Sequence, residues 1–163
     1  MPRHRTAVLV HAGAMRFEAA TGTGRTVVYG DDVELNEYSP VETLATALAA
    51  CSAMDVVSIL AKKRQVLTSY RIEVAADQRD EYPQIFTRVE VTHDLQGTVL
   101  LEHAVRRAIH LSASKYCPVN AMLSAGETEV HHRFRMKCTG AVPHEAEDEV
   151  IVTGPHQSLA VVP

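Results

Sequence analysis

SPVETLATALAACSAMDVVSILAKKR, residues 39–64, is the stretch on which the fold of this chain depends. Ser39 is a preferred N-cap, Pro40 suits the first helical position, and Glu42 completes a capping box three residues after the cap. Three basic residues, 62–64, end the stretch, where cations complement the negative end of the helix dipole. We therefore expect one helix of about 24 residues, about 36 Å long.

One thiol, Cys51, lies in the middle of this stretch. Residues three, four and seven positions away share its helical face. Those residues are mostly apolar: Leu44, Ala47, Leu48, Met54, Asp55 and Ser58. Because like charges repel, Asp55 makes the thiol harder to ionise, so a reactive Cys51 needs a cation from elsewhere in the fold. The alternative interpretation is a buried, structural cysteine.

Composition restricts the class of protein. The chain has 163 residues, which are enough for one domain with a hydrophobic core. Its formal net charge is −4. No basic run indicates nucleic acid, and no apolar run is long enough to span a membrane. Three widely spaced cysteines, an odd number, are not typical of a secreted disulfide scaffold. We therefore expect a cytoplasmic protein without nucleic-acid or membrane partners.

The order of the other elements predicts an α+β fold. Short β-rich runs at 6–10, 16–21 and 26–29 predict an N-terminal β-meander. The elements expected after the long helix are strands at 70–77 and 85–95, helices near 99–114 and from Pro118, and a final strand at 128–136. We expect a single domain, residues 1–138, and a mobile tail, residues 139–163, where this periodicity is lost.

The long helix is rich in alanine and apolar around its circumference. Such a slender helix allows another element to approach closely, and the small sheets expected here cannot cover all of it. We therefore expect a homodimer that buries the helix against a second copy.

A second thiol, Cys117, precedes Pro118 and falls at the N-cap position of the short helix. The helix dipole favours a thiolate there, whereas Cys51 has no such help from local sequence. If the two helices pack side by side, the two thiols form a redox pair. One is oxidised and the other resolves it as a disulfide.

His131 and His132 are adjacent on the expected final strand, and Cys138 follows them. Neighbouring residues of a strand point to opposite faces, so the two histidines make a poor chelate. We therefore expect no metal site and no cofactor, and we interpret Cys138 as an incidental thiol.

The motifs SPVETLATALAACSAMDVVSIL and LSASKYCPVNAML together resemble those of the OsmC/Ohr family of thiol peroxidases, over roughly residues 15–135. The resemblance is greatest to its OsmC-like branch. It implies an intertwined homodimer whose paired long helices are wrapped by strands of both subunits. It also implies a peroxidase for organic hydroperoxides, in which the cysteine matching Cys51 is peroxidatic and the one matching Cys117 is resolving. A small or protein-bound dithiol then reduces the disulfide.

Two departures from the family pattern are visible. The family has a glutamate directly after the helix-start proline, whereas Val41 stands there and Glu42 follows, pointing away from Cys51 on a continuous helix. Arg25 is the nearest match for the family's activating arginine, and Arg16 is the alternative. These departures leave a rival function open: a binding protein of the same fold with catalytically idle thiols and a small apolar ligand.

Overall fold

The computed structural model describes residues 4–32, 34 and 37–155 of the chain. The chain divides into two compact units, residues 1–44 and 45–163. The boundary falls inside the long helix α1 (Pro40–Lys62), which begins at the predicted proline. Arg64 has φ 57°, a left-handed conformation with which the chain leaves the helix.

The N-terminal unit is a three-stranded sheet made of β1 (Ala7–His11), β2 (Phe17–Thr21) and β3 (Thr26–Tyr29). The strands pair antiparallel in chain order, which confirms the predicted meander. Gly24, in the turn between β2 and β3, has φ 78°, which glycine adopts at low steric cost. Every residue of β1 is exposed, so this sheet buries little apolar surface of its own.

The C-terminal unit is built on a four-stranded sheet in the order β4-β5-β6-β7. Its strands are β4 (Val66–Gln78), β5 (Phe86–Val99), β6 (Glu129–Cys138) and β7 (His144–Thr153). The pairs β4–β5 and β6–β7 are antiparallel, and β5–β6 is parallel. A parallel pair needs a crossover connection, and the helices between β5 and β6 provide it.

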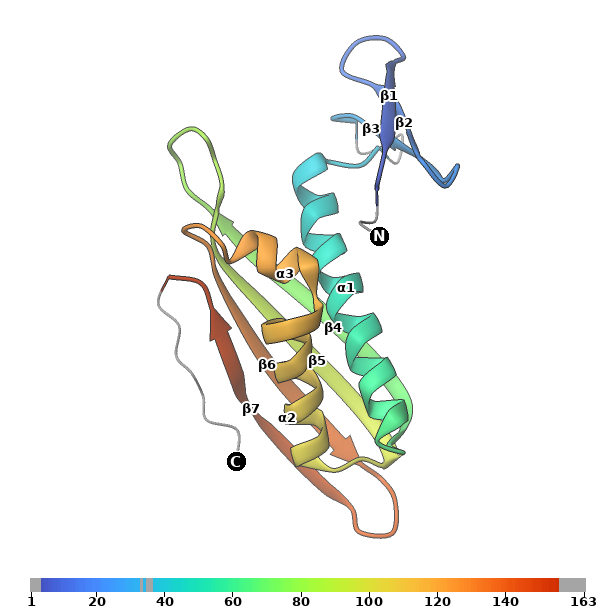
Figure 1. Ribbon diagram of the computed structural model, residues 1–163, viewed down its shortest axis with the longest axis vertical. Helices are drawn as coiled ribbons and strands as arrows, with labels where there is room; N and C mark the ends of the chain where they lie inside the picture. The colour runs from blue at the N-terminus through green and yellow to red at the C-terminus, as the bar shows by residue number, and fades with distance from the viewer. Residues whose placement is uncertain (1–3, 33, 35–36, 156–163) are drawn as a thin grey trace. The chain divides into compact units, whose positions relative to one another are not determined.

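Helices cover one face of this sheet (Figure 1). Besides α1, they are α2 (Glu102–Leu111) and α3 (Pro118–Leu123), joined by one π-helical turn, η1 (Ser112–Tyr116). The buried residues of α1 recur every four positions: Leu48, Ser52, Val56 and Leu60. This spacing is that of one helical face, and it lays α1 along the sheet. The observed elements confirm the predicted α+β class.

The core of the C-terminal unit consists of two apolar clusters. One gathers Val56 and Leu60 of α1 with residues of α2, β6 and β7, and the other gathers Leu48 with residues of β5 and Cys117. Full burial of each of these aliphatic side chains contributes roughly 1.5–3 kcal/mol. Buried polar side chains also lie among the helices and strands: Ser52, His93, Ser112, Asn120 and His132. These polar residues build the site described below.

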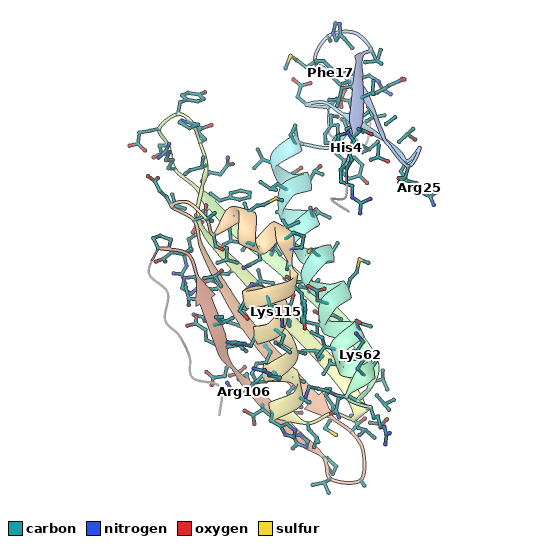
Figure 2. All side chains as sticks on the ribbon, in the orientation of Figure 1. His4, Phe17, Arg25, Lys62, Arg106 and Lys115 are labelled. Atoms are coloured by element: carbon teal, nitrogen blue, oxygen red, sulfur yellow. The ribbon has the colours of Figure 1, made fainter. Side chains whose placement is uncertain are left out.

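The expectation of a mobile tail from residue 139 is wrong for residues 144–153. They form β7, which pairs antiparallel with β6. Its last residues, Val150–Val152, are buried in the core. Figure 2 labels Arg106 of α2, whose guanidinium bonds the Asp148 carboxylate of β7 at 2.6 Å. Asp148 thus pairs with a basic neighbour, and the apolar end of the strand is packed.

The expectation that no apolar run is long enough to span a membrane also needs correction. By length and composition alone, α1 meets that requirement. The core helix of a soluble protein meets it equally well, and α1 packs one face against a sheet. The absence of a membrane partner therefore stays a prediction.

Candidate active site

Two thiols and a carboxylate converge where α1 meets the start of α3. Cys51 Sγ, Cys117 Sγ and a carboxylate oxygen of Asp55 all lie within 4.8 Å of one another. Cys51 and Asp55 stand four residues apart on α1 and therefore share one face of the helix. The proximity of the two thiols, which the sequence predicts only if the helices pack together, is confirmed.

The π-helical turn and the start of α3 set the position of Cys117. Its backbone N–H donates to the Ser112 carbonyl at 2.9 Å, a bond that reaches back five residues. Cys117 is the N-cap of α3, as predicted, and its Sγ accepts from the Asn120 N–H at 3.3 Å. Ser52 Oγ of α1 donates to the same sulfur at 3.9 Å. These contacts leave Cys117 only 2% exposed.

The start of α3 does favour a Cys117 thiolate, as expected, because the Asn120 N–H lowers the pKa of Cys117, but burial outweighs this effect. Burial is the largest cause, and together with the hydrogen bond to Cys51 it raises the pKa of this thiol to about 11. The Asn120 N–H and the Ser52 hydroxyl lower the pKa without offsetting that rise. Desolvation penalises the charged form, and α3 has only six residues. Reduced Cys117 is therefore a protonated thiol at neutral pH.

Cys51 is the more accessible of the two thiols. It is half-buried and packs beside the apolar cluster that contains Leu48 and Cys117. Leu44 and Met54, which the helical pattern also places on its face, are 41% and 74% exposed. The apolar surroundings predicted for Cys51 are therefore buried on one side and open on the other.

A chain of hydrogen bonds leads from Tyr70 on β4 to Asn120 on α3. Asn120 Nδ2 lies 2.9 Å from the Ala113 carbonyl, which can only accept, so Oδ1 faces His132. His132 Nε2 then donates to Oδ1 at 3.0 Å, and its Nδ1 accepts from His93 Nε2 at 3.3 Å. His93 Nδ1 is left to accept the Tyr70 O–H at 2.7 Å. The Ala113 carbonyl thus determines which atom donates and which accepts in each hydrogen bond of this chain.

Both histidines of this network, Tyr70–His93–His132–Asn120, are neutral. They are 0% exposed, and burial lowers the pKa of His132 to about 4 and that of His93 well below its ordinary value. A neutral imidazole has one donor and one acceptor, which the directed chain requires. The Asn120 backbone N–H bonds Cys117, so the network anchors the residue that holds this thiol. Its members come from four elements, and sequence analysis missed it.

The other candidate residues belong to the N-terminal unit. Arg25 is exposed at the turn between β2 and β3, where Figure 2 labels it. Arg16 forms an ion pair with Glu37 at 2.7 Å. Glu42 lies in the first turn of α1, as expected from the capping-box pattern. Activation of Cys51 by Arg25 or Arg16 stays a prediction.

His131 and His132 face opposite ways, as predicted. His131 Nδ1 lies 3.1 Å from Glu149, whereas His132 belongs to the buried network. Cys138 is buried at the end of β6, with its Sγ 3.8 Å from the Thr98 carbonyl. Among the residues that the structure describes, metal-type donors gather instead at Cys51, Asp55 and Cys117.

The fold and the paired cysteines agree with one protein family. The family model for OsmC-like proteins matches residues 30–133, and the chain belongs to this family. Protein YhfA of Escherichia coli K12 is 40% identical over 117 residues, which are 72% of this chain and 87% of that protein.

Solved structures share the fold. A hypothetical protein from Aquifex aeolicus VF5 has a TM-score of 0.72 at 26% identity, and the match covers 83% of this chain and 98% of that one. An organic hydroperoxide resistance protein from Elizabethkingia anophelis has a TM-score of 0.62 at 13% identity, with 81% and 95% covered. The second likeness concerns the fold alone.

Proposed function

We propose that this protein is a thiol-dependent peroxidase that reduces organic hydroperoxides and serves in oxidative-stress defence. The observation that carries the proposal is the approach of Cys51 and Cys117, whose sulfur atoms lie within 4.8 Å in a partly enclosed site. The family includes cysteine-based peroxidases, and some proteins of the same fold are named organic hydroperoxide resistance proteins.

The reaction has two steps on the protein. Cys51 sulfur attacks the peroxide oxygen, the O–O bond breaks, and the products are a Cys51 sulfenic acid and an alcohol. The Cys117 thiol then attacks that sulfenic sulfur, which forms the Cys51–Cys117 disulfide and releases water. A small or protein-bound dithiol reduces the disulfide and is itself oxidised.

The surroundings of the two thiols support this division of roles. Cys51 is half-buried and therefore accessible to a hydroperoxide, whereas Cys117 is 2% exposed and has a pKa raised to about 11. A protonated, buried thiol suits the second step, in which the partner sulfur is already close. Arg25, or Arg16 in its place, supplies the cation that favours the Cys51 thiolate in this proposal.

The intact mass of the reduced protein tests the proposal. One equivalent of an organic hydroperoxide, without reductant, should remove two hydrogens from the chain by forming one disulfide. Peptide mapping should join Cys51 to Cys117, and the Cys138→Ser variant should behave in the same way. An unchanged mass would favour the rival function, which is the binding of a small apolar ligand. The presence of Val41 where the family has a glutamate supports that rival.

We also propose that the protein is a cytoplasmic homodimer. Several apolar side chains of α1 remain exposed in the single chain: Val41, Leu44, Met54 and Val57. A second copy packed against α1 would cover such side chains, and the valines of β1 are exposed as well. Reduced thiols persist in the cytoplasm, as the proposed reaction requires. A monomer mass in sedimentation at micromolar concentration would contradict the dimer.

A further inference from the structure

The peroxidase reaction leaves Asp55 without a role. Its carboxylate lies within 4.8 Å of both sulfur atoms, yet no step of that reaction uses it. The same carboxylate becomes favourable if a divalent cation occupies the space between the three groups. A hydrogen bond fixes the position of the Asp55 carboxylate: Ser112 Oγ donates to its Oδ2 at 3.0 Å.

The donor set indicates which cation fits. Two cysteine sulfurs and one carboxylate are ligands for Zn²⁺, whereas Mg²⁺ and Ca²⁺ prefer sites made only of oxygen. Tetrahedral Zn²⁺ with Zn–S bonds of about 2.3 Å places two sulfur ligands about 3.8 Å apart. The donor atoms here lie within 4.8 Å of one another, so the two sulfur atoms need to approach by no more than about 1 Å.

Two of the three ligands, Cys117 and Asp55, also have the supporting hydrogen bonds that are typical of metal sites. Cys51 and Asp55 are presented by one helical turn, so their spacing is fixed by the backbone. The Asn120 N–H supports Cys117 Sγ at 3.3 Å, and Ser112 orients Asp55. Asn120 is itself held through its side chain by Ala113, Thr153 and His132.

We propose that the reduced protein binds one Zn²⁺ per chain through Cys51 Sγ, Cys117 Sγ and Asp55, with the fourth position open to water or another small ligand. This part of the proposal does not depend on peroxidase activity. It differs from the expectation, drawn from the sequence, of no metal site.

A regulatory consequence rests on the proposed function. A disulfide between Cys51 and Cys117 removes both thiolate ligands, so zinc binding and the oxidised state exclude each other. Zinc-bound dithiolate, one hydroperoxide and two protons yield the disulfide, an alcohol, water and free Zn²⁺. Bound zinc thus protects the reduced pair and is released when the pair is oxidised.

The test is a zinc-binding measurement on the reduced full-length chain. After dialysis from excess Zn²⁺ against zinc-free buffer, elemental analysis should find one zinc per chain, and the oxidised protein should retain none. Asp55→Asn keeps the shape of the side chain and an acceptor for Ser112, and it should weaken binding at least tenfold, as should Cys117→Ser. Cys138→Ser, which removes the remaining thiol, is the matched control and should bind as the wild type does.

Circular dichroism of each variant establishes that weakened binding does not come from unfolding. Absence of stoichiometric zinc in the wild type, or equal affinity in folded Asp55→Asn, would overturn the site. Hydroperoxide consumption by the zinc-free protein is measured separately. Its failure would overturn the peroxidase function while leaving the zinc stoichiometry interpretable.

Discussion

The two cysteines of the site are neighbours in space but are held by different means. Cys51 stands on a continuous helix and is half-buried, and Met54, three residues further along the same helix, is exposed. Cys117 stands between a π-helical turn and a six-residue helix, is almost fully buried, and receives hydrogen bonds from Ser52 and Asn120. The helix α1 thus positions Cys51, whereas hydrogen bonds from neighbouring elements position Cys117.

This contrast explains why two identical functional groups can serve different steps. An accessible thiol on a rigid helix can meet a substrate that arrives from outside the protein. A buried thiol that is fixed by hydrogen bonds needs to meet only its partner sulfur. The variants below separate the two environments, beginning with the largest expected effect.

Serine substitution of each thiol should give unequal results. In Cys117→Ser, the first equivalent of organic hydroperoxide should still be consumed, and Cys51 should over-oxidise to sulfinic acid under excess. In Cys51→Ser, consumption should fall to background although Cys117 remains, because that thiol is buried and has a raised pKa. Hydroperoxide consumption and intact mass measure both outcomes.

Reversed results would exchange the roles of the two cysteines. If the wild type and both variants are equally inert, the peroxidase function fails and the ligand-binding function takes its place. Cys138→Ser is the matched control, since its sulfur lies at the end of β6 beside the Thr98 carbonyl.

Deletion of residues 140–163 should unfold the C-terminal unit. It removes β7, whose Val150, Ile151 and Val152 are buried. Each contributes roughly 1.5–3 kcal/mol, and their sum is comparable to the whole stability of a domain. The deletion also removes Thr153, which accepts from the Asn120 side chain. Thermal unfolding followed by circular dichroism measures the effect, and a cooperative transition near that of the full chain would contradict it.

Acid should lower the free energy of unfolding, because it protonates the buried histidines of the network that holds Asn120 and Cys117. The pKa of His132 is about 4 in the folded chain and about 6.5 when unfolded, so the unfolded state binds more protons between these values. Stability therefore falls as pH falls through this window, by about 2 kcal/mol for His132 between pH 7.5 and pH 5. The lowered pKa of His93 acts in the same direction. Urea unfolding across this range measures the loss.

The variant His132→Gln is the control for this pH dependence. Its amide can donate to Asn120 and accept from His93, but it does not titrate. The variant should lose the His132 share of the pH dependence while keeping a folded structure. An unchanged dependence would place the titrating group elsewhere.

Local patterns predicted the parts of this molecule that are locally determined. Ser39 and Pro40 mark the start of α1, and Pro118 places Cys117 at an N-cap, because caps depend on a few adjacent residues. The strand β7 was missed because its acidic residues suggest a solvated tail. Glu145 and Glu149 instead alternate along an edge strand and pair with Lys137 and Arg133 of β6. The match between acidic residues in this segment and basic residues in β6 was the signal that could have predicted the strand pair.

The pKa of Cys117 and the network beneath it could not be predicted in this way. Tyr70, His93, His132 and Asn120 are single polar residues in four elements, and the sheet register brings them together. The parallel pairing of β5 with β6 sets Val91 opposite His132 and His93 opposite Phe134. Burial depends on the same tertiary packing, and it outweighs the helix start at Cys117.

The direction of the hydrogen-bond network can be tested at its far end. In Tyr70→Phe, His93 Nδ1 loses the O–H that lies 2.7 Å away and becomes a buried acceptor without a partner. This should cost about 1–3 kcal/mol of unfolding free energy, measured in urea at pH 7.5. Tyr82→Phe is the matched control, because Tyr82 is 88% exposed and its hydroxyl remains solvated. The first equivalent of hydroperoxide should be consumed as in the wild type, since Cys51 lies outside the network. Equal stability of the two variants would mean that the Tyr70 hydroxyl does not donate to His93, and the order of donors that begins at the Ala113 carbonyl would then be wrong.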